Sequence, residues 1–212
     1  MGRARPHSTG EQWADGCVHA AGLLAGLAGA VVLVVLARDN GEKLASSIVY
    51  SLGLLAMLAA SAAYNVGYHS RFRSIFRRCD HSAIFLMIAG TYTPFTTHFF
   101  TGFSAIAITG LIWSLSLGGI ALKILRPVAF ERYSVVLYLA LGWIAVLVVG
   151  PMLMVMSWLA TVALVAGGLL YTGGITFHLW ENMRFQNAIW HVFVLAAAGC
   201  HYVAVLNGVV LT

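Results

Sequence analysis

The stretch RRCDHSAIFLMIAGTYTPF, from Arg77 to Phe95, carries the features on which the fold of this chain depends. It opens a predicted span, residues 81–99, that is long enough to cross a bilayer, yet the span begins beside the carboxylate of Asp80 and the imidazole of His81. A charged side chain at the centre of a bilayer is costly, whereas one at a helix end reaches the headgroup region. Arginines precede Asp80, and a TYTP run follows about three helical turns deeper. This combination predicts that Asp80 belongs to a polar site at the end of a membrane helix.

The composition of the whole chain is that of a membrane protein with several spans. Of its 212 residues, 60% are hydrophobic and 9% are charged, against roughly 25% charged in a soluble domain. The net charge of +5 resides in short loops between apolar runs, which favours the lipid bilayer as a partner and argues against nucleic acid. The cysteines, Cys17, Cys79 and Cys200, have neither the pairing of a disulfide framework nor the spacing of a metal knuckle.

Apolar stretches of about 18 to 22 residues predict an all-α fold, a bundle of seven transmembrane helices in one domain covering residues 1–212. The predicted spans are residues 17–37, 44–64, 81–99, 103–125, 134–153, 156–178 and 189–211. Residues 1–16 are polar, and we expect them to form a short segment before a retained first helix. Gly150-Pro151 predicts the break between the fifth and sixth spans, since proline cannot donate a helix hydrogen bond.

The distribution of positive charge predicts the orientation of the bundle. Of the 12 lysines and arginines, only Arg38 and Lys43 fall on one predicted side, and the other ten fall on the opposite side. Loops rich in lysine and arginine stay in the cytoplasm, so the N-terminus is predicted inside and the C-terminus outside. The expected location is the plasma (inner) membrane of a bacterium.

Polar residues of three spans are predicted to lie at the same, cytoplasmic depth. Ser61 and Asn65 end the second span, Asp80 begins the third, and Asn187 and His191 begin the seventh. Each pair is four residues apart and therefore shares one face of a helix. Because polar residues within membranes usually face the bundle interior, a site between these three spans is expected.

Most of the other histidines are assigned to the cavity lining or to the membrane interface. His81 points about 100° away from Asp80 on the helix and is expected to make another contact of the cavity. His201 is deeper by about 15 Å than His191, and is either a buried, hydrogen-bonded residue or part of the cavity lining. His19, His69 and His178 are read as interfacial residues, and His98 receives no role. Haem is disfavoured, because axial ligation needs facing histidines deep in two helices and only His201 is deep.

Long motifs carry a resemblance to a known family. They are DHSAIFLMIAGTYTPF at 80–95, GGLLYTGGITFH at 167–178 and AIWHVFVLAAAGCHYVAV at 188–205. Here the chain resembles the hemolysin III proteins of bacteria, which belong with the progestin and adipoQ receptors. The resemblance implies seven helices, a cytoplasmic N-terminus and a zinc site near the cytoplasmic face.

In the family pattern, zinc is held by a histidine of the second helix and an HxxxH pair of the seventh, with an aspartate of the third helix beside a zinc-bound water. Ser61, Asp80 and His191 match this pattern. Asn65 and Asn187 stand where the other two histidines are expected. An amide oxygen is a far poorer zinc ligand than imidazole, so no tightly held zinc is predicted at that position. His69 is a possible substitute ligand.

These residues leave three functions open. The first is a membrane-homeostasis or sensor-like protein whose cavity responds to a lipid or another ligand, with Asn65, His81, Asn187 and His201 as lining residues. The second is a metal-dependent lipid amide hydrolase, in which Asp80 acts as base, assisted by Ser61, and His191 binds the metal. The third, suggested by the family name, is membrane lysis through a pore, ranked last because no span carries a polar stripe.

Overall fold

The computed structural model describes residues 8–68, 70–148, 152 and 154–212, and it consists of helices joined by short turns. The helices are α1 (Thr9–Ala37), α2 (Gly41–Val66), α3 (Arg73–Phe99), α4 (Gly102–Leu125), α5 (Pro127–Val148), α7 (Trp158–Leu179) and α8 (Gln186–Val205), which a short π-helix, η1 (Leu206–Val210), extends. Over these residues the predicted seven-helix bundle is confirmed, with each predicted span inside or close to one helix. The predicted break at Gly150-Pro151 and the candidate ligand His69 lie outside the described residues.

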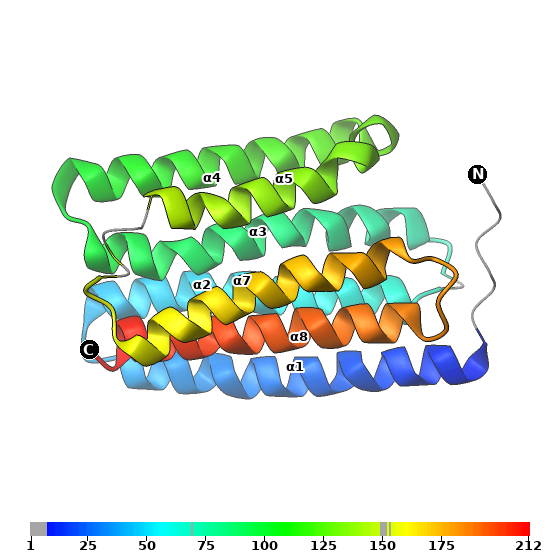
Figure 1. The fold of residues 1–212 in the computed structure, drawn as a ribbon, viewed down its shortest axis with the longest axis horizontal. Coiled ribbons are helices and arrows are strands. Elements are labelled where there is room, and N and C mark those ends of the chain that lie inside the picture. Colours follow the sequence, from blue (N-terminus) through cyan, green and yellow to red (C-terminus); the bar gives the residue numbers. More distant parts are fainter. Residues whose placement is uncertain (1–7, 69, 149–151, 153) are drawn as a thin grey trace.

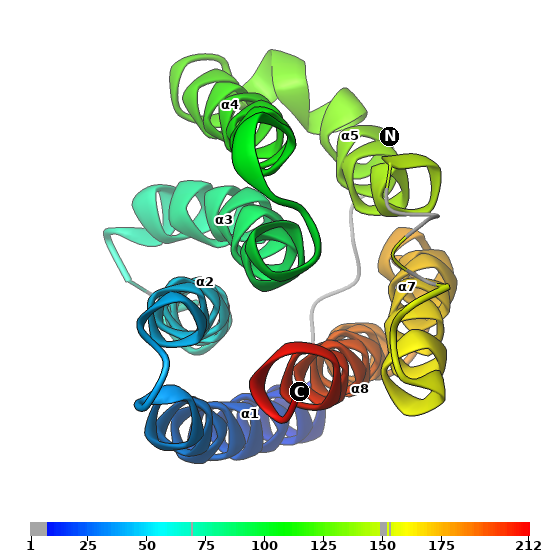
Figure 2. The same ribbon diagram turned by 90° about the vertical axis from the view of Figure 1, so that its left-hand side faces the viewer.

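The helices form a closed ring when viewed along their axes (Figure 2). Each helix packs against the next along the chain, and α8 closes the ring by packing against both α7 and α1. Helix α1 begins at one end of the bundle and η1 finishes at the other, as an odd number of crossings requires (Figure 1). One end of the ring therefore gathers the start of α1, the end of α2, the start of α3 and the start of α8.

Within the part of the chain that the structure describes, five helices are long and apolar enough to cross a membrane by themselves, namely α1, α2, α4, α7 and α8 with η1. Their outward faces expose large apolar side chains, as lipid-facing helices do, for example Leu24, Leu52, Ile106 and Leu169. Helix α3 is less apolar because it carries Arg77, Arg78 and Asp80 together with the TYTP run. It packs between α2 and α4 and has much of its second half buried.

The TYTP run links α3 to its neighbours. The hydroxyl of Tyr92 donates to the backbone oxygen of Leu141 on α5 at 2.8 Å, and the indole of Trp113 on α4 donates to the Thr93 hydroxyl at 3.1 Å. Thr93 itself donates to the carbonyl of Ala89 on its own helix. These contacts satisfy polar groups within a helix interrupted by Pro94, whose ring nitrogen cannot donate. The run therefore fixes the position of α3, and its Thr91 and Tyr92 also line the cavity inside the bundle.

Two helix starts differ from the prediction, and both affect the site. Helix α1 begins at Thr9 instead of residue 17, because Ser8 and Glu11 form a capping box that satisfies the first backbone N–H groups. Helix α3 begins at Arg73, so that Asp80 lies two turns inside the helix and not at its start. Hydropathy did not reveal these polar first turns, although both are helical.

Candidate functional site

A single cavity of about 830 Å³ brings together every residue that the sequence places in the site. It runs inside the helix ring from the polar end of the bundle past its middle, as far as Phe95 and Met152. The predicted residues that line it are Ser61, Asn65, Asp80, His81, Asn187, His191 and His201. Glu11, Asp15 and His19 of α1 line it as well, and the sequence assigned no functional role to any of them.

Helix α1 presents these three residues through a regular spacing. Glu11, Asp15 and His19 follow one another at intervals of four, and all are buried. Gly22 and Gly26 continue the same face, where added β-carbons would meet side chains of Leu195 and Leu58. The absence of side chains at these glycines lets α1 lie close to α8 and α2. The polar first turns of α1 are thereby held against the start of α8.

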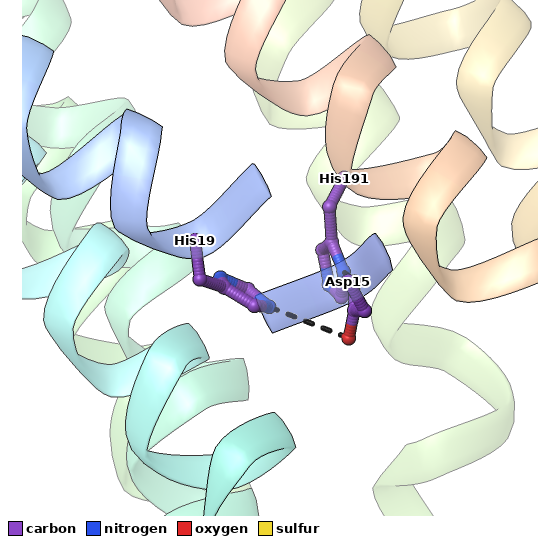
Figure 3. A group of neighbouring side chains, drawn as sticks. All are labelled: Asp15, His19 and His191. Atoms are coloured by element: carbon purple, nitrogen blue, oxygen red, sulfur yellow. Dashed lines mark hydrogen bonds and ion pairs between the residues drawn. The ribbon is translucent and has the colours of Figure 1, made fainter. Parts of the chain in front are cut away.

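Asp15, His19 and His191 form a cluster between α1 and α8 (Figure 3). The Oδ1 atom of Asp15 lies 2.5 Å from Nδ1 of His191, and Oδ2 of Asp15 lies 3.6 Å from Nε2 of His19. The two imidazole rings are 4.4 Å apart between their centroids. Each of the three residues exposes less than a tenth of its surface. One carboxylate is thus shared by two histidines away from bulk water.

Glu11 fixes the start of α8 relative to this cluster. Its Oε1 accepts a hydrogen bond of 2.8 Å from the backbone N–H of Phe185, the residue that precedes α8. Phe185 has a φ of 59°, a left-handed conformation that is uncommon for residues other than glycine. Its side chain provides no cap, so the Glu11 carboxylate supplies the acceptor that the helix start needs. This contact places His191, one and a half turns into α8, opposite Asp15.

Asp80 of α3 lines the same cavity as the cluster. Its carboxylate is within hydrogen-bonding reach of the Ser61 side chain and interacts electrostatically with His191 and His19. The buried ammonium of Lys123, whose side chain is 1% exposed, also acts on it. Asn65, which the sequence places in the same site, donates its amide N–H to the Ser61 backbone oxygen of its own helix at 2.9 Å.

His81 and His201 occupy different parts of the lining. The ring of His81 lies edge-on to that of Tyr64, with 6.5 Å between centroids. His201 hydrogen-bonds to the backbone of Leu164 on α7 and lies 5.5 Å from the ring of Tyr171. Both alternatives considered for His201 therefore apply, since it is hydrogen-bonded and also lines the cavity.

The remaining histidines lie apart from the cluster. The ring of His178 is 5.0 Å from that of Trp190 on α8. His98 lies at the far end of the bundle, where its Nε2 is 3.2 Å from the Thr212 hydroxyl. Among the residues that the structure describes, Asp15, His19 and His191 are the one group of His, Cys, Asp or Glu side chains close enough to share an ion.

The zinc position implied by the family resemblance does not suit this chain. Of its three ligand positions, only His191 offers an imidazole. Asn65 uses its amide for a bond within α2, and an amide oxygen is a weak ligand for zinc. Asp15 and His19 are better donors, and both lie beside His191.

The sequence does contain a pattern that points to Asp15 and His19. The S-x-x-E pattern at residues 8–11 marks a helix start, and from there the four-residue spacing continues into the Gly22 and Gly26 face.

The sequence matches the family model described as "Haemolysin-III related" over residues 8–202. It is 32% identical to the "Hemolysin-3 homolog" of Bacillus subtilis over 198 residues, which cover 92% of this chain and 93% of the relative. "Hemolysin-3" of Bacillus cereus is also 32% identical, with 92% and 90% of the two chains covered. The human "Monocyte to macrophage differentiation factor" is 30% identical over 209 residues, with 96% and 86% covered.

Proposed function

The chain belongs to the Haemolysin-III related family of multi-pass membrane proteins, and on this premise we propose that it binds an amphiphilic membrane lipid inside its helix ring as a sensor-like protein of membrane homeostasis. One observation carries the proposal. The cavity is polar at one end, where Asp15, Asp80 and His191 line it, and apolar further along, where Met87, Phe95 and other hydrophobic residues line it.

The dimensions of the cavity suit such a ligand. A volume of about 830 Å³ lies in the upper part of the roughly 300–1,000 Å³ range of small-molecule sites. From Asp80 to Phe95, helix α3 rises about 22 Å, whereas one leaflet contributes about 15 Å of hydrocarbon, half of a bilayer core of roughly 30 Å. An acyl chain can therefore extend along the apolar part while its headgroup stays at the polar end.

The entrance supplies positive charge for that headgroup. Arg73 and Arg77, in the first turns of α3, both line the cavity. The guanidinium of Arg73 stacks on the ring of Tyr68 at 4.0 Å and on that of Tyr64 at 5.3 Å. Such stacking holds a guanidinium in place at low conformational freedom. Lipids with a strongly polar headgroup are therefore the favoured ligands.

The test is binding of a photoactivatable fatty-acid analogue to the purified protein in detergent. Gly168 lines the cavity, and a β-carbon there would meet only the Trp143 ring, at 3.8 Å. Gly168→Phe should therefore fill the cavity and lower labelling severalfold. The control is Gly118→Phe on α4, because an added β-carbon meets nothing there within 4 Å. Equal labelling of both variants and the wild type would place the lipid elsewhere.

The predicted orientation puts the polar end of the cavity in the cytoplasm, as the lysine and arginine distribution favours. A reporter fused after Thr212 should then be active on the outer side of the membrane. A reporter inserted between α2 and α3 should report the cytoplasm. A cytoplasmic C-terminus would contradict the proposed orientation.

A second candidate function is hydrolysis of an amide bond in the bound lipid. It is favoured by Asp80, a carboxylate that lies within reach of Ser61 and close to two histidines and can serve as a general base. Asp80→Asn should abolish release of fatty acid from a lipid amide while photolabelling of the cavity is retained. Wild-type protein that releases no fatty acid would exclude this candidate and leave lipid binding intact.

Membrane lysis remains the third prediction. Two relatives carry the word hemolysin in their names. The carboxylates and guanidinium groups that line the described cavity lie at one end of the bundle and do not follow a path across it, namely Glu11, Asp15, Arg73, Arg77, Asp80 and Glu181. A wide aqueous pore would need such groups along its whole length.

A further inference from the structure

We propose that Asp15, His19 and His191 hold a divalent first-row transition metal of the zinc type, at a position that differs from the one implied by the family resemblance. The resemblance puts the ligands on the second and seventh helices, whereas two of the three ligands proposed here come from α1. The proposal goes beyond lipid binding, because it concerns the polar end of the cavity alone and can be tested without a lipid.

The donor set is one that zinc and related ions favour. Two imidazoles and one carboxylate, with a fourth position open to a small molecule, form a common catalytic type of zinc site. The same three donors also suit Fe²⁺. All three side chains are buried, so water competes weakly for the ion.

The spacing of the donors matches a shared ion. The candidate ligand atoms all lie within 4.8 Å of one another. Oδ1 of Asp15 is 2.5 Å from Nδ1 of His191, and Oδ2 of Asp15 is 3.6 Å from Nε2 of His19. Tetrahedral ligands at 2.0–2.1 Å from an ion are separated by about 3.3 Å, which lies between these two values. Shifts of less than about 1 Å in flexible side chains would therefore complete the site.

An unsatisfied atom points to the same conclusion. The Nε2 atom of His19 is buried and has no hydrogen-bond partner among the described residues. Its closest ion-pair partner is Oδ2 of Asp15, 3.6 Å away, a separation too long for a good hydrogen bond. Buried polar atoms in native proteins are nearly always satisfied, and a metal ion would use the lone pair of this nitrogen.

The surrounding structure holds the ligands in place before any ion binds. Asp15 and His19 are separated by one turn of a helix whose start is fixed by a capping box. Glu11 on the same face binds the backbone of Phe185 and so fixes the start of α8, which carries His191. Because the ligands sit on two packed helices, metal binding requires little ordering of the chain.

Metal content of the full-length protein tests the proposal. Protein purified in detergent without added metal or chelator should contain close to one equivalent of zinc or iron by elemental analysis. After removal of the metal, addition of Co²⁺ should produce the visible absorption of a four- or five-coordinate ion at one equivalent. Zn²⁺ should also raise the melting temperature of the metal-free wild type, because an ion that binds the folded state stabilises it.

The decisive variant is His19→Gln, compared with His178→Gln as the matched control. His178 lies at the same end of the bundle and lines the same cavity, but it is not part of the cluster. His19→Gln should weaken Co²⁺ binding at least tenfold, and His178→Gln should leave it unchanged. Wild type that binds neither Co²⁺ nor Zn²⁺ would overturn the proposal even if the variants fail to fold. Equal losses in the two variants, or full binding by His19→Gln, would overturn it as well.

Discussion

The contact between α1 and α8 differs from the end of α2 in what its polar side chains do. On α2, Asn65 donates its amide N–H to the backbone of Ser61, four residues earlier on the same helix. On α1, Asp15 reaches across to His191 of α8, and His19 keeps a buried nitrogen without a hydrogen-bond partner among the described residues. The Asn65 amide is thus satisfied within its own helix, whereas Asp15 and His19 of α1 are directed to a point between two helices.

In this chain the α2 side of the cavity has Asn65 where the family has a histidine, whereas the α1 side carries Asp15 and His19. The helix ring brings residues of α1, α2, α3 and α8 to the same cavity, so several sets of side chains can surround one space. His191 belongs both to the zinc position of the family and to the cluster with Asp15 and His19, because it lines the cavity that the two sites share. A motif therefore predicts the location of a site better than it predicts which residues occupy it.

The largest effect is expected for His191→Ala, which leaves the buried carboxylate of Asp15 without its closest partner. Removal of one member of a buried pair costs about 3–5 kcal/mol in the free energy of unfolding. Asn187→Ala, about one turn earlier on α8 and half-buried, should cost less than about 1 kcal/mol. Unfolding of both variants in mixed micelles measures the difference, and equal losses would mean that the Asp15–His191 contact contributes little.

The second largest effect is expected when the metal ligands are placed at the family positions on α2 and α8. In a His19→Gln background, Asn65→His together with Asn187→His should restore zinc binding, since three imidazoles and a water then complete a tetrahedral site. At zinc concentrations about 100 times the dissociation constant, the gain in stability is about 2.7 kcal/mol. Either change alone should give only partial rescue, because it supplies two imidazoles instead of three beside the carboxylate of Asp15. Zinc stoichiometry and melting temperature with and without zinc test this, and full rescue by a single change would refute it.

A smaller effect is expected for Asp80, whose carboxylate interacts with Ser61, His191 and Lys123. Asp80→Ala should lower the free energy of unfolding by about 1–3 kcal/mol, the usual penalty for losing one partner of a buried polar contact. Glu181→Ala, in an exposed turn between α7 and α8, should produce no measurable change. If the two variants behave alike in thermal unfolding, Asp80 is a solvated charge and not part of the site.

The smallest effect is expected for Asn65→Ala. The hydrogen bond of Asn65 stays within α2, and alanine is a better helix former, so the two contributions nearly cancel. The free energy of unfolding should change by no more than about 0.5 kcal/mol. A loss above about 1 kcal/mol would show that Asn65 supports the cavity from α2 and that the contrast with α1 is weaker than proposed.

Much of the fold follows from the sequence, because the helices form through local interactions and apolar length. The number of helices, their order and the grouping of Ser61, Asp80 and His191 at one end are readable from hydropathy and four-residue spacing. The start of α1 at Thr9 was also encoded, in the Ser8–Glu11 capping box, although the hydropathy of the following turns concealed it.

Only the tertiary structure determined which polar side chains meet. Asp15 and His191 are 176 residues apart in the sequence, and they make contact because α8 closes the ring on α1. The rotation of α1 depends on packing at Gly22 and Gly26, and the position of α8 on a hydrogen bond from Phe185 to Glu11. Each helix sets the spacing of its own side chains, but their distance to another helix depends on packing along the whole bundle. The sequence by itself therefore determined a polar end of a seven-helix bundle, and the packing of α1 against α8 decided which side chains could bind an ion there.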